Sequence, residues 1–447
     1  MAPQFTTQLN GSMTFSASLS ASMHTSANVT TSRNYRPLVR DHAARQSNGP
    51  PPPLILSVEE ADQLELVADS VMQQTLADYL HFRDVRKRRL HDEQWKEVRR
   101  QDNLVAFKER DSWRQQHQTL CTPDGRLEPV VCKTSVPTLL VLGALQGTLD
   151  DEMYGMHVDS DNAAKLRSSY IHDQVNDLRV LTRIRGATVD DPFRFCGVMW
   201  MDLGSSRYGP FAKKRDYCVV TSMGVTNTAR GERLGYYVVH SVDVSSNGPM
   251  GRSTQLGLGA NSGDCNSSKF IRAKGSMCWL KCELPNGSVE LYMQGFFAPM
   301  GSVPEFAVVN AALNAALGLA QTSDTAYSKK IRWMLHDSVR STRRLVSPTM
   351  EDCVGRCKTH FGVSKKRKLG CCIVCRALVC TSCRTTRKVT VDVAPDSIVQ
   401  QTRCSICFLC MLYAKQTSAT VFAAREMAMA RARSNRALST ETSEYIL

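Results

Sequence analysis

The residues best suited to chemistry in this sequence are the cysteines of one C-terminal stretch. Ten of the 17 cysteines lie between Cys353 and Cys410, mostly as pairs separated by two residues. A turn of this length presents two sulfurs to one cation, and Zn²⁺ prefers four thiolates at tetrahedral angles. Four such turns predict two zinc ions per chain. A disulfide framework is the alternative, but no secretory signal is visible and the other seven cysteines are scattered, which favours reduced thiols.

The cysteine spacing resembles that of a FYVE-type zinc finger. In that family the first and third cysteine pairs bind one zinc ion, and the second and fourth pairs bind the other. The resemblance implies that the ligands of the first ion are Cys353, Cys357, Cys380 and Cys383. It implies that the ligands of the second ion are Cys372, Cys375, Cys404 and Cys407. Cys371 and Cys410 would then bind no metal.

Basic residues beside these cysteines correspond to the family's lipid-binding motifs. They are Lys365, Lys366, Arg367 and Lys368, together with Arg403. The finger lacks the histidine pair and the leading Trp-x-x-Asp that contact the 3-phosphate of phosphatidylinositol 3-phosphate in the family. Because lysine is a flexible point charge, we expect weak, salt-dependent attraction to an anionic membrane surface. The alternative is that these lysines only balance the charge of the thiolates.

The elements that must position the finger begin after a polar N-terminus. Residues 1–54 are rich in Ser, Thr and Pro, and we expect them to be disordered. The pattern Ser57-x-x-Glu60 predicts a capping box and a helix, which the charged residues 83–100 extend. Apolar β-type runs then alternate with turns over 138–297. An Ala/Leu-rich helix to Ala320 and a second helix over 324–345 close this region, which predicts an α+β fold.

Several of these runs resemble a START-like lipid-binding domain of the variety found ahead of a degenerate FYVE finger. They are Pro-Thr-Leu-Leu-Val-Leu-Gly from 137, Asp-Pro-Phe-Arg-Phe from 191, Lys-Arg-Asp-Tyr from 214, Gly-Tyr-Tyr-Val-Val-His-Ser-Val-Asp from 235 and Val-Pro-Glu-Phe from 303. The resemblance implies a helix-grip fold over 55–345, in which a curved antiparallel sheet wraps around the C-terminal helix and one lipid occupies an apolar tunnel. A finger over 350–412 follows, and then a tail over 413–447 with one helical stretch. We expect chelation of zinc to unfold the finger and to leave the preceding domain folded.

Two features bear on the expected tunnel. The helix before residue 320 carries small residues that would leave room beneath it, although core packing is the simpler interpretation: Ala311, Ala312, Ala315, Ala316 and Gly318. Arg194 lies between two phenylalanines and is expected to be buried. It would meet either a lipid headgroup or, as we favour, a carboxylate in a structural salt bridge.

The sequence therefore predicts a non-enzymatic, zinc-binding and lipid-binding adaptor with membrane or protein partners. It is expected to be cytoplasmic, at endosomal or other membrane surfaces. No catalytic motif such as Gly-x-Ser-x-Gly is visible. One alternative is a RING-like E3 ubiquitin ligase, since RING fingers share the interleaved zinc sites. The other is a zinc protein that binds nucleic acid, which the net charge of +14 and the run Arg86–Arg89 allow. We favour a solvated helix face for that run, because acids follow it.

Overall fold

The computed structural model describes residues 53–113, 136–171, 175, 177–203, 213–242, 270–320, 322–340, 353, 370–393, 399–429 and 432. Of residues 1–54, which were expected to be disordered, 1–52 lie outside this part of the chain. So do the predicted ligand Cys357 and the basic run Lys365–Lys368. Leu54 is ordered, because its backbone N–H donates to the Leu181 carbonyl oxygen at 2.8 Å.

The first helix begins as its capping box predicts. In α1 (Val58–Leu80), the Glu60 backbone N–H donates to Ser57 Oγ at 3.2 Å, and the Ser57 N–H donates to Glu60 Oε2 at 2.8 Å. A π-helical turn, η2 (His81–Val85), ends the helix. The predicted helical continuation to residue 100 is wrong, because β1 (Trp95–Gln101) is a strand paired with β2 (Leu104–Glu109). As the edge strand of the sheet, β1 is largely exposed, and its many charges therefore fit a strand equally well.

One antiparallel sheet forms the centre of the molecule. Its further strands are β3 (Leu139–Leu145), β4 (Asp177–Arg185), β5 (Phe195–Asp202), β6 (Lys214–Asn227), β7 (Arg233–Ser241), β8 (Phe270–Arg272), β9 (Lys274–Glu283) and β10 (Val289–Ala298). The strand order is β1-β2-β3-β10-β9-β7-β6-β5-β4, and β8 pairs with β6 in parallel. β9 and β10 form the hairpin that Asn286-Gly287 predicts, with Gly287 at φ 79°.

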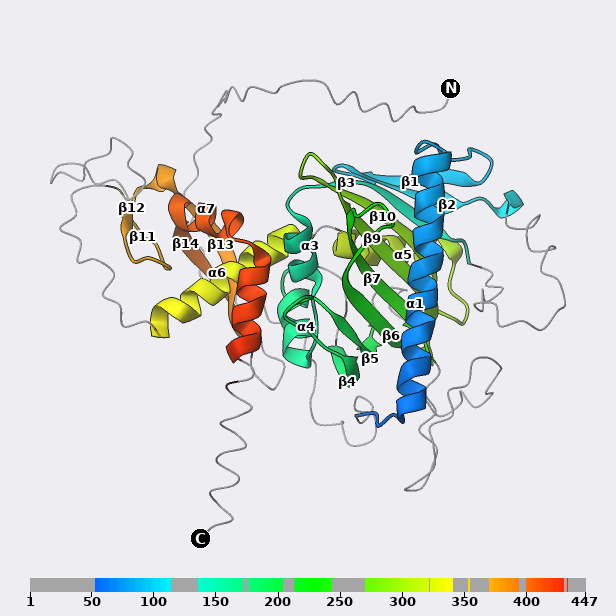
Figure 1. Cartoon of the computed structure of the whole chain (residues 1–447), viewed down its shortest axis with the longest axis horizontal. Helices are drawn as coiled ribbons and strands as arrows, with labels where there is room; N and C mark the ends of the chain where they lie inside the picture. The colour runs from blue at the N-terminus through cyan, green and yellow to red at the C-terminus, as the bar shows by residue number, and fades with distance from the viewer. Residues whose placement is uncertain are drawn as a thin grey trace, which may run out of the picture.

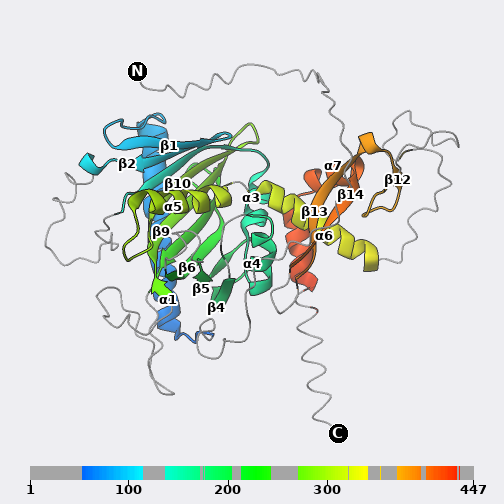
Figure 2. The ribbon, with the colours of Figure 1, turned by 180° about the vertical axis from the view of Figure 1, so that it is seen from behind.

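Both faces of the sheet are buried, and helices cover each of them. α1 lies across one face, whereas α5 (Glu305–Ala320) crosses the other face together with α3 (Leu149–Met156) and α4 (Asp161–Ser168) (Figures 1 and 2). Strand alternation separates the two cores: on β9, Met277 and Trp279 join the core on the α5 side, whereas Cys278 and Leu280 join the core on the α1 side. The chain thus has the α+β helix-grip architecture that the resemblance predicts.

The C-terminal elements are small and lie beside α6 (Ser323–Arg340) (Figure 1). They are β11 (Gly370–Cys371), β12 (Leu378–Val379), the 3₁₀ turn η5 (Thr381–Cys383), β13 (Arg384–Val393), β14 (Val399–Cys407) and α7 (Phe408–Gln416). Residues 419–429 form one more helical stretch. In the described part of the chain, none of the helices has the length and apolar character that crossing a membrane requires.

Candidate metal centre and the core beneath α5

Four cysteine sulfurs gather where β11–β12 meets the junction of β14 and α7. They belong to Cys372, Cys375, Cys407 and Cys410, and all lie within 4.8 Å of one another. Cys372 and Cys375 lie on the turn between β11 and β12, where Arg376 adopts a left-handed backbone with φ 62°. Cys407 ends β14 and caps α7, so that Cys410 lies in the first turn of that helix. The group offers four sulfur ligands to one cation, which fits zinc.

We call these four residues the second cysteine group, because they correspond to the second predicted zinc ion. Hydrogen bonds to sulfur support this group. The Cys407 backbone N–H donates to Cys372 Sγ at 3.3 Å, and the Cys410 N–H donates to Cys407 Sγ at 3.4 Å. Hydrogen bonds from the thiols of Cys375, Cys407 and Cys410 lower the pKa of Cys372, whereas sharing protons with Cys372 raises the pKa of Cys407 and Cys410. A bound divalent cation would replace these shared protons, because only the thiolate is a metal ligand.

The second group differs from the predicted set at one position. Cys410, expected to bind no metal, takes the place of Cys404. The reason is local geometry: Cys404 and Cys407 both lie in β14, where residues three apart point to opposite faces. Cys407 and Cys410 instead span the start of a helix. Cys404 is buried, and its Sγ donates to the Thr402 carbonyl oxygen at 3.6 Å.

A first group is formed by three of the four cysteines predicted for it. The sulfurs of Cys353, Cys380 and Cys383 lie within 4.8 Å of one another, and the Cys380 N–H donates to Cys353 Sγ at 3.5 Å. Cys357, the predicted fourth ligand, lies outside the described residues. The two groups interleave along the chain, as a cross-brace requires. Cys371 is exposed and belongs to neither group.

Among the basic residues assigned to an anionic surface, the structure describes Arg403. It is exposed on β14 and lies directly opposite Lys388 of β13. The run Arg86–Arg89, considered for nucleic acid, is partly engaged elsewhere. Arg88 forms a salt bridge with Glu290 at 2.6 Å.

The finger shares a helix with the sheet domain. On α6, Ile331 is fully buried in the core of the finger, and Leu335 packs against that core. Met334 packs against both this core and the core beneath α5. Trp333 packs on the core beneath α5, with its ring 5.6 Å from that of Phe422 in the helical stretch 419–429. The helix α6 therefore contributes side chains to both cores.

Polar contacts join the same two parts of the molecule. The Thr390 backbone N–H of β13 donates to Tyr170 Oη at 2.7 Å, and Gln401 Nε2 of β14 donates to the Ser169 carbonyl oxygen at 2.7 Å. Lys330 of α6, fully buried, forms a salt bridge with Asp151 of α3 and donates to the Thr417 carbonyl oxygen. These contacts bind the finger to α3 and α4.

A second buried ion pair fixes α3 to the sheet. Lys281 Nζ of β9 lies 2.7 Å from Glu152 Oε2, and both side chains are buried. Glu152 also accepts hydrogen bonds from the backbone N–H groups of Thr322 at 2.9 Å and Ser323 at 3.1 Å. Burial lowers the pKa of Lys281, which the Glu152 carboxylate partly offsets. Sequence inspection missed both pairs, because a single lysine in a strand or a helix, such as Lys281 or Lys330, looks like a surface residue.

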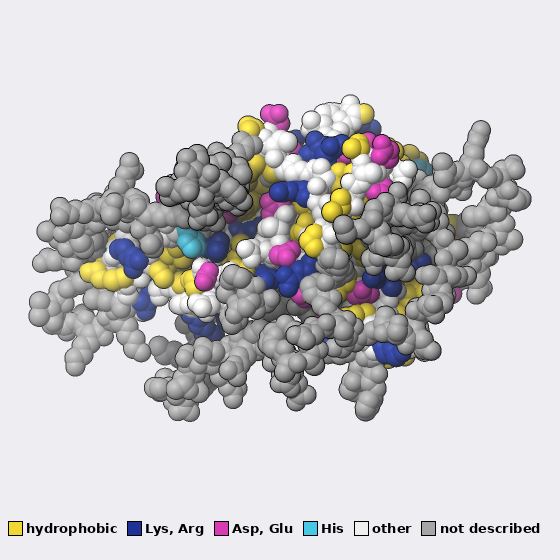
Figure 3. All heavy atoms as spheres, turned by 90° about the horizontal axis from the view of Figure 1, so that it is seen from below, with side chains coloured by type: hydrophobic (Ala, Val, Ile, Leu, Met, Phe, Trp, Pro, Cys, Tyr) yellow, Lys and Arg dark blue, Asp and Glu magenta, His cyan; other side chains and the backbone are white. Residues whose placement is uncertain are grey.

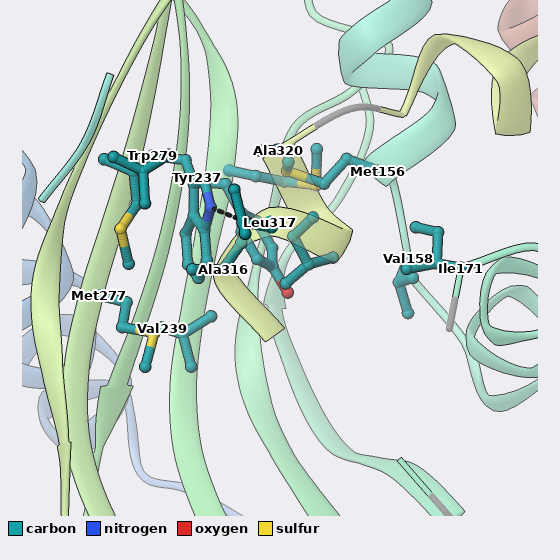
Figure 4. Packing of buried hydrophobic residues seen from close by; sticks show 14 of the residues in the cluster. Met156, Val158, Ile171, Tyr237, Val239, Met277, Trp279, Ala316, Leu317 and Ala320 are labelled. Carbon is teal, nitrogen blue, oxygen red and sulfur yellow. Dashed lines mark hydrogen bonds between the residues drawn. The ribbon is translucent and has the colours of Figure 1, made fainter. Parts of the chain in front are cut away.

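The core between the sheet and α5 is apolar and unusually rich in methionine. Its buried methionines are Met153, Met156, Met199, Met201, Met223, Met277 and Met293, whereas the core on the α1 side holds Met72 alone. The small residues of α5 make room for protein side chains: Trp279 Nε1 donates to the Ala316 carbonyl oxygen at 3.2 Å, and Tyr237 lies beside Trp279 (Figure 4). This part of the molecule is therefore a packed core of adaptable side chains.

The polar groups buried in this core do not include Arg194, which the sequence predicted to be buried. Arg194 is not buried, and it pairs with Glu65 at 3.5 Å with nearly half of its side chain exposed. A guanidinium that is buried here is that of Arg167 on α4, which donates to the Met156 carbonyl oxygen and to Tyr237 Oη. Tyr217 Oη is buried without a hydrogen-bond partner among the described residues, and burial raises its pKa. An unpaired buried hydroxyl is costly. The hydroxyl of Thr221, which lies on the same face of β6, is likewise buried without a partner among the described residues.

Comparisons with known proteins find likeness only at the level of solved structures. No family model matches the sequence, and no curated protein does. Human StAR-related lipid transfer protein 5 is 11% identical, with a TM-score of 0.32 over 57% of this chain and 96% of its own. The lipid transfer and protein localization domain of human StarD13 (DLC2) is 13% identical, with a TM-score of 0.31 over 56% and 95%. A STAR-related lipid transfer protein fragment from Xanthomonas axonopodis is 15% identical, with a TM-score of 0.30 over 52% and 98%.

Proposed function

We propose that this chain is a non-enzymatic adaptor that binds one lipid between its sheet and α5 and two zinc ions in its finger. It would act in the cytoplasm, at endosomal or other membrane surfaces, where the finger, of FYVE type, contacts the membrane or a protein. The observation that carries the lipid-binding part is the methionine-rich core beneath α5. Unbranched thioether side chains repack at low cost, so they can yield volume to an apolar ligand.

The polar groups of this core support binding and not catalysis. Glu152 and Lys281 satisfy each other, and Asp151 satisfies Lys330, so these charges hold helices in place. The hydroxyl of Tyr217 is different, because it has no partner among the described residues. A ligand that enters beside it with one polar group would satisfy that hydroxyl and fill the apolar remainder of the site.

Zinc in this proposal is structural. Cys372, Cys375, Cys407 and Cys410 would complete the shell of one ion and leave no open position for a substrate. Cys353, Cys380 and Cys383 would hold the other ion with Cys357. Each ion would tie together segments that are distant along the chain.

The lipid-binding part is tested by mass spectrometry of organic extracts from the purified full-length protein. We expect one lipid class to copurify in near-stoichiometric amount. Tyr217→Phe should leave folding intact and reduce the copurified ligand, because it removes one hydroxyl that has no partner in the described part of the chain. The matched control is Tyr292→Phe on the opposite face of the sheet, whose hydroxyl donates to Gln294 Oε1 at 2.6 Å. It should cost about 1 kcal/mol of stability and leave the ligand bound.

Extracts that contain no lipid, from protein that also fails to bind fluorescent lipid analogues, would contradict this function. Equal loss of ligand in both tyrosine variants would remove the assigned role of Tyr217.

A further inference from the structure

The outward side of α7 is apolar, although the rest of the helix already buries an apolar side. Cys410, Met411 and Ala414 face the core of the finger and are buried. The apolar face of α7 consists of Phe408, Leu409 and Tyr413, which are 60%, 47% and 47% exposed, respectively. A surface helix normally carries polar residues on its outward side, so this face is adapted to something other than water.

The second cysteine group fixes the direction of this face. Cys407 caps α7, and its Sγ accepts a hydrogen bond from the Cys410 N–H in the first turn. Because Cys407 and Cys410 must both point at the other two cysteines, the helix cannot rotate about its axis. Phe408 and Leu409, which lie between these two cysteines, are therefore held outward.

The finger around this face carries more basic than acidic side chains. Its described residues include one acid, Asp392, and six basic side chains: Arg376, Arg384, Arg387, Lys388, Arg403 and Lys415. Lys388 and Arg403 face each other across β13 and β14, and like charges in facing positions repel. An anionic partner would relieve that repulsion.

The basic and apolar residues meet around the second cysteine group. Arg384 lies opposite Cys407 in the β13–β14 register, and Phe408 is the next residue in the chain. Arg376 follows Cys375, whose sulfur lies 3.8 Å from that of Cys407. Figure 3 shows hydrophobic and basic side chains close together at the finger end of the molecule.

We propose that the apolar face of α7 and the basic residues around the second cysteine group form a docking surface for an anionic lipid bilayer. A bilayer boundary offers apolar depth for Phe408 and Leu409, a polar level for the hydroxyl of Tyr413, and negative charge for the arginines. Each four-thiolate zinc site contributes a formal −2, and the positive charge that remains favours this occupant over a protein. The surface rests on the membrane contact proposed above and assigns residues to it.

The test is cosedimentation of the full-length, zinc-loaded protein with vesicles of phosphatidylcholine alone or mixed with phosphatidylserine. We expect binding to the mixed vesicles that weakens between about 50 and about 150 mM salt. The double variant Phe408→Ser/Leu409→Ser should bind about tenfold or more weakly, because two apolar side chains no longer enter the boundary. Leu66→Ser is the matched control, since Leu66 is 67% exposed on α1, and it should bind as the unmodified protein does. Zinc content by elemental analysis should be equal in all three proteins.

Two outcomes would overturn the docking surface. One is equal vesicle binding by the double variant and the unmodified protein. The other is no vesicle binding by either protein at low salt, which would leave a protein as the occupant. Lipid extraction from the same preparations separates this result from the proposed function: lipid that still copurifies leaves binding beneath α5 intact while the docking surface falls.

Discussion

Removing the metal from the finger should loosen the sheet domain as well, because α6 belongs to both cores. Without its folded partner, Ile331 would pass from full burial to water, which costs about 2–3 kcal/mol. The hydrogen bonds from Thr390 and Gln401 to the segment after α4 add about 1 kcal/mol each. The sum of about 4–5 kcal/mol is a large share of the 5–15 kcal/mol that stabilises a typical domain. The expectation of an independent sheet domain therefore needs revision.

Hydrogen exchange with and without chelator measures this coupling directly. We expect faster exchange in α6 and α3, and an earlier denaturant midpoint for β5 and β9. The matched pair of variants is Ile331→Ala and Leu313→Ala, each expected to cost about 2–5 kcal/mol. Only Ile331→Ala should also weaken zinc retention, because coupling between two sites is reciprocal. Leu313 lies on α5 and belongs to the core of the sheet domain, not to that of the finger. An unchanged midpoint for β5 and β9 after full removal of metal would refute the reasoning.

Three further predictions concern single sites. Cys410→Ser should lower the zinc content by one ion per chain, whereas Cys404→Ser should retain both ions in elemental analysis; the opposite pattern would restore the original ligand set. Glu152→Ala should destabilise the protein by about 3–5 kcal/mol in urea unfolding, and more than Lys281→Met does, because it strands a buried ammonium and two backbone N–H groups. Burial lowers the pKa of His157 from 6.5 to about 4, so the unfolded state binds its proton first and stability falls as pH drops from about 6.5 to about 4, by at most roughly 3 kcal/mol. His157→Phe should flatten this part of the stability profile, and an unchanged acid slope would show that another group titrates.

The sequence predicts the fold well where patterns are local. The capping box at Ser57 and the hairpin at Asn286-Gly287 each depend on a few adjacent residues, and both occur as expected. The strand β1 was missed because an edge strand tolerates charges on both faces, so Lys96 and Arg100 give no period-two pattern. Only pairing with β2, which depends on residues further along the chain, makes this segment a strand.

The metal centre shows the same division. Cysteine spacing predicts two interleaved groups. The three cysteines at 404, 407 and 410 are each separated by two residues, so either Cys404 and Cys407 or Cys407 and Cys410 could be the ligand pair. The choice depends on where β14 stops and α7 starts, and Cys407 as the helix cap decides it. The sharing of α6 between two cores was not predictable. Ile331 and Trp333 are both apolar residues of one helix, and the sequence does not indicate which core each side chain enters.

Native mass spectrometry of the intact chain tests the central claim most directly, because one spectrum reports both metal and lipid. The account predicts a mass that exceeds that of the polypeptide by two zinc ions and one lipid. Collisional activation should release the lipid first, since the zinc ions are held by several thiolates each. A spectrum of folded protein without lipid and with fewer than two zinc ions would contradict the account.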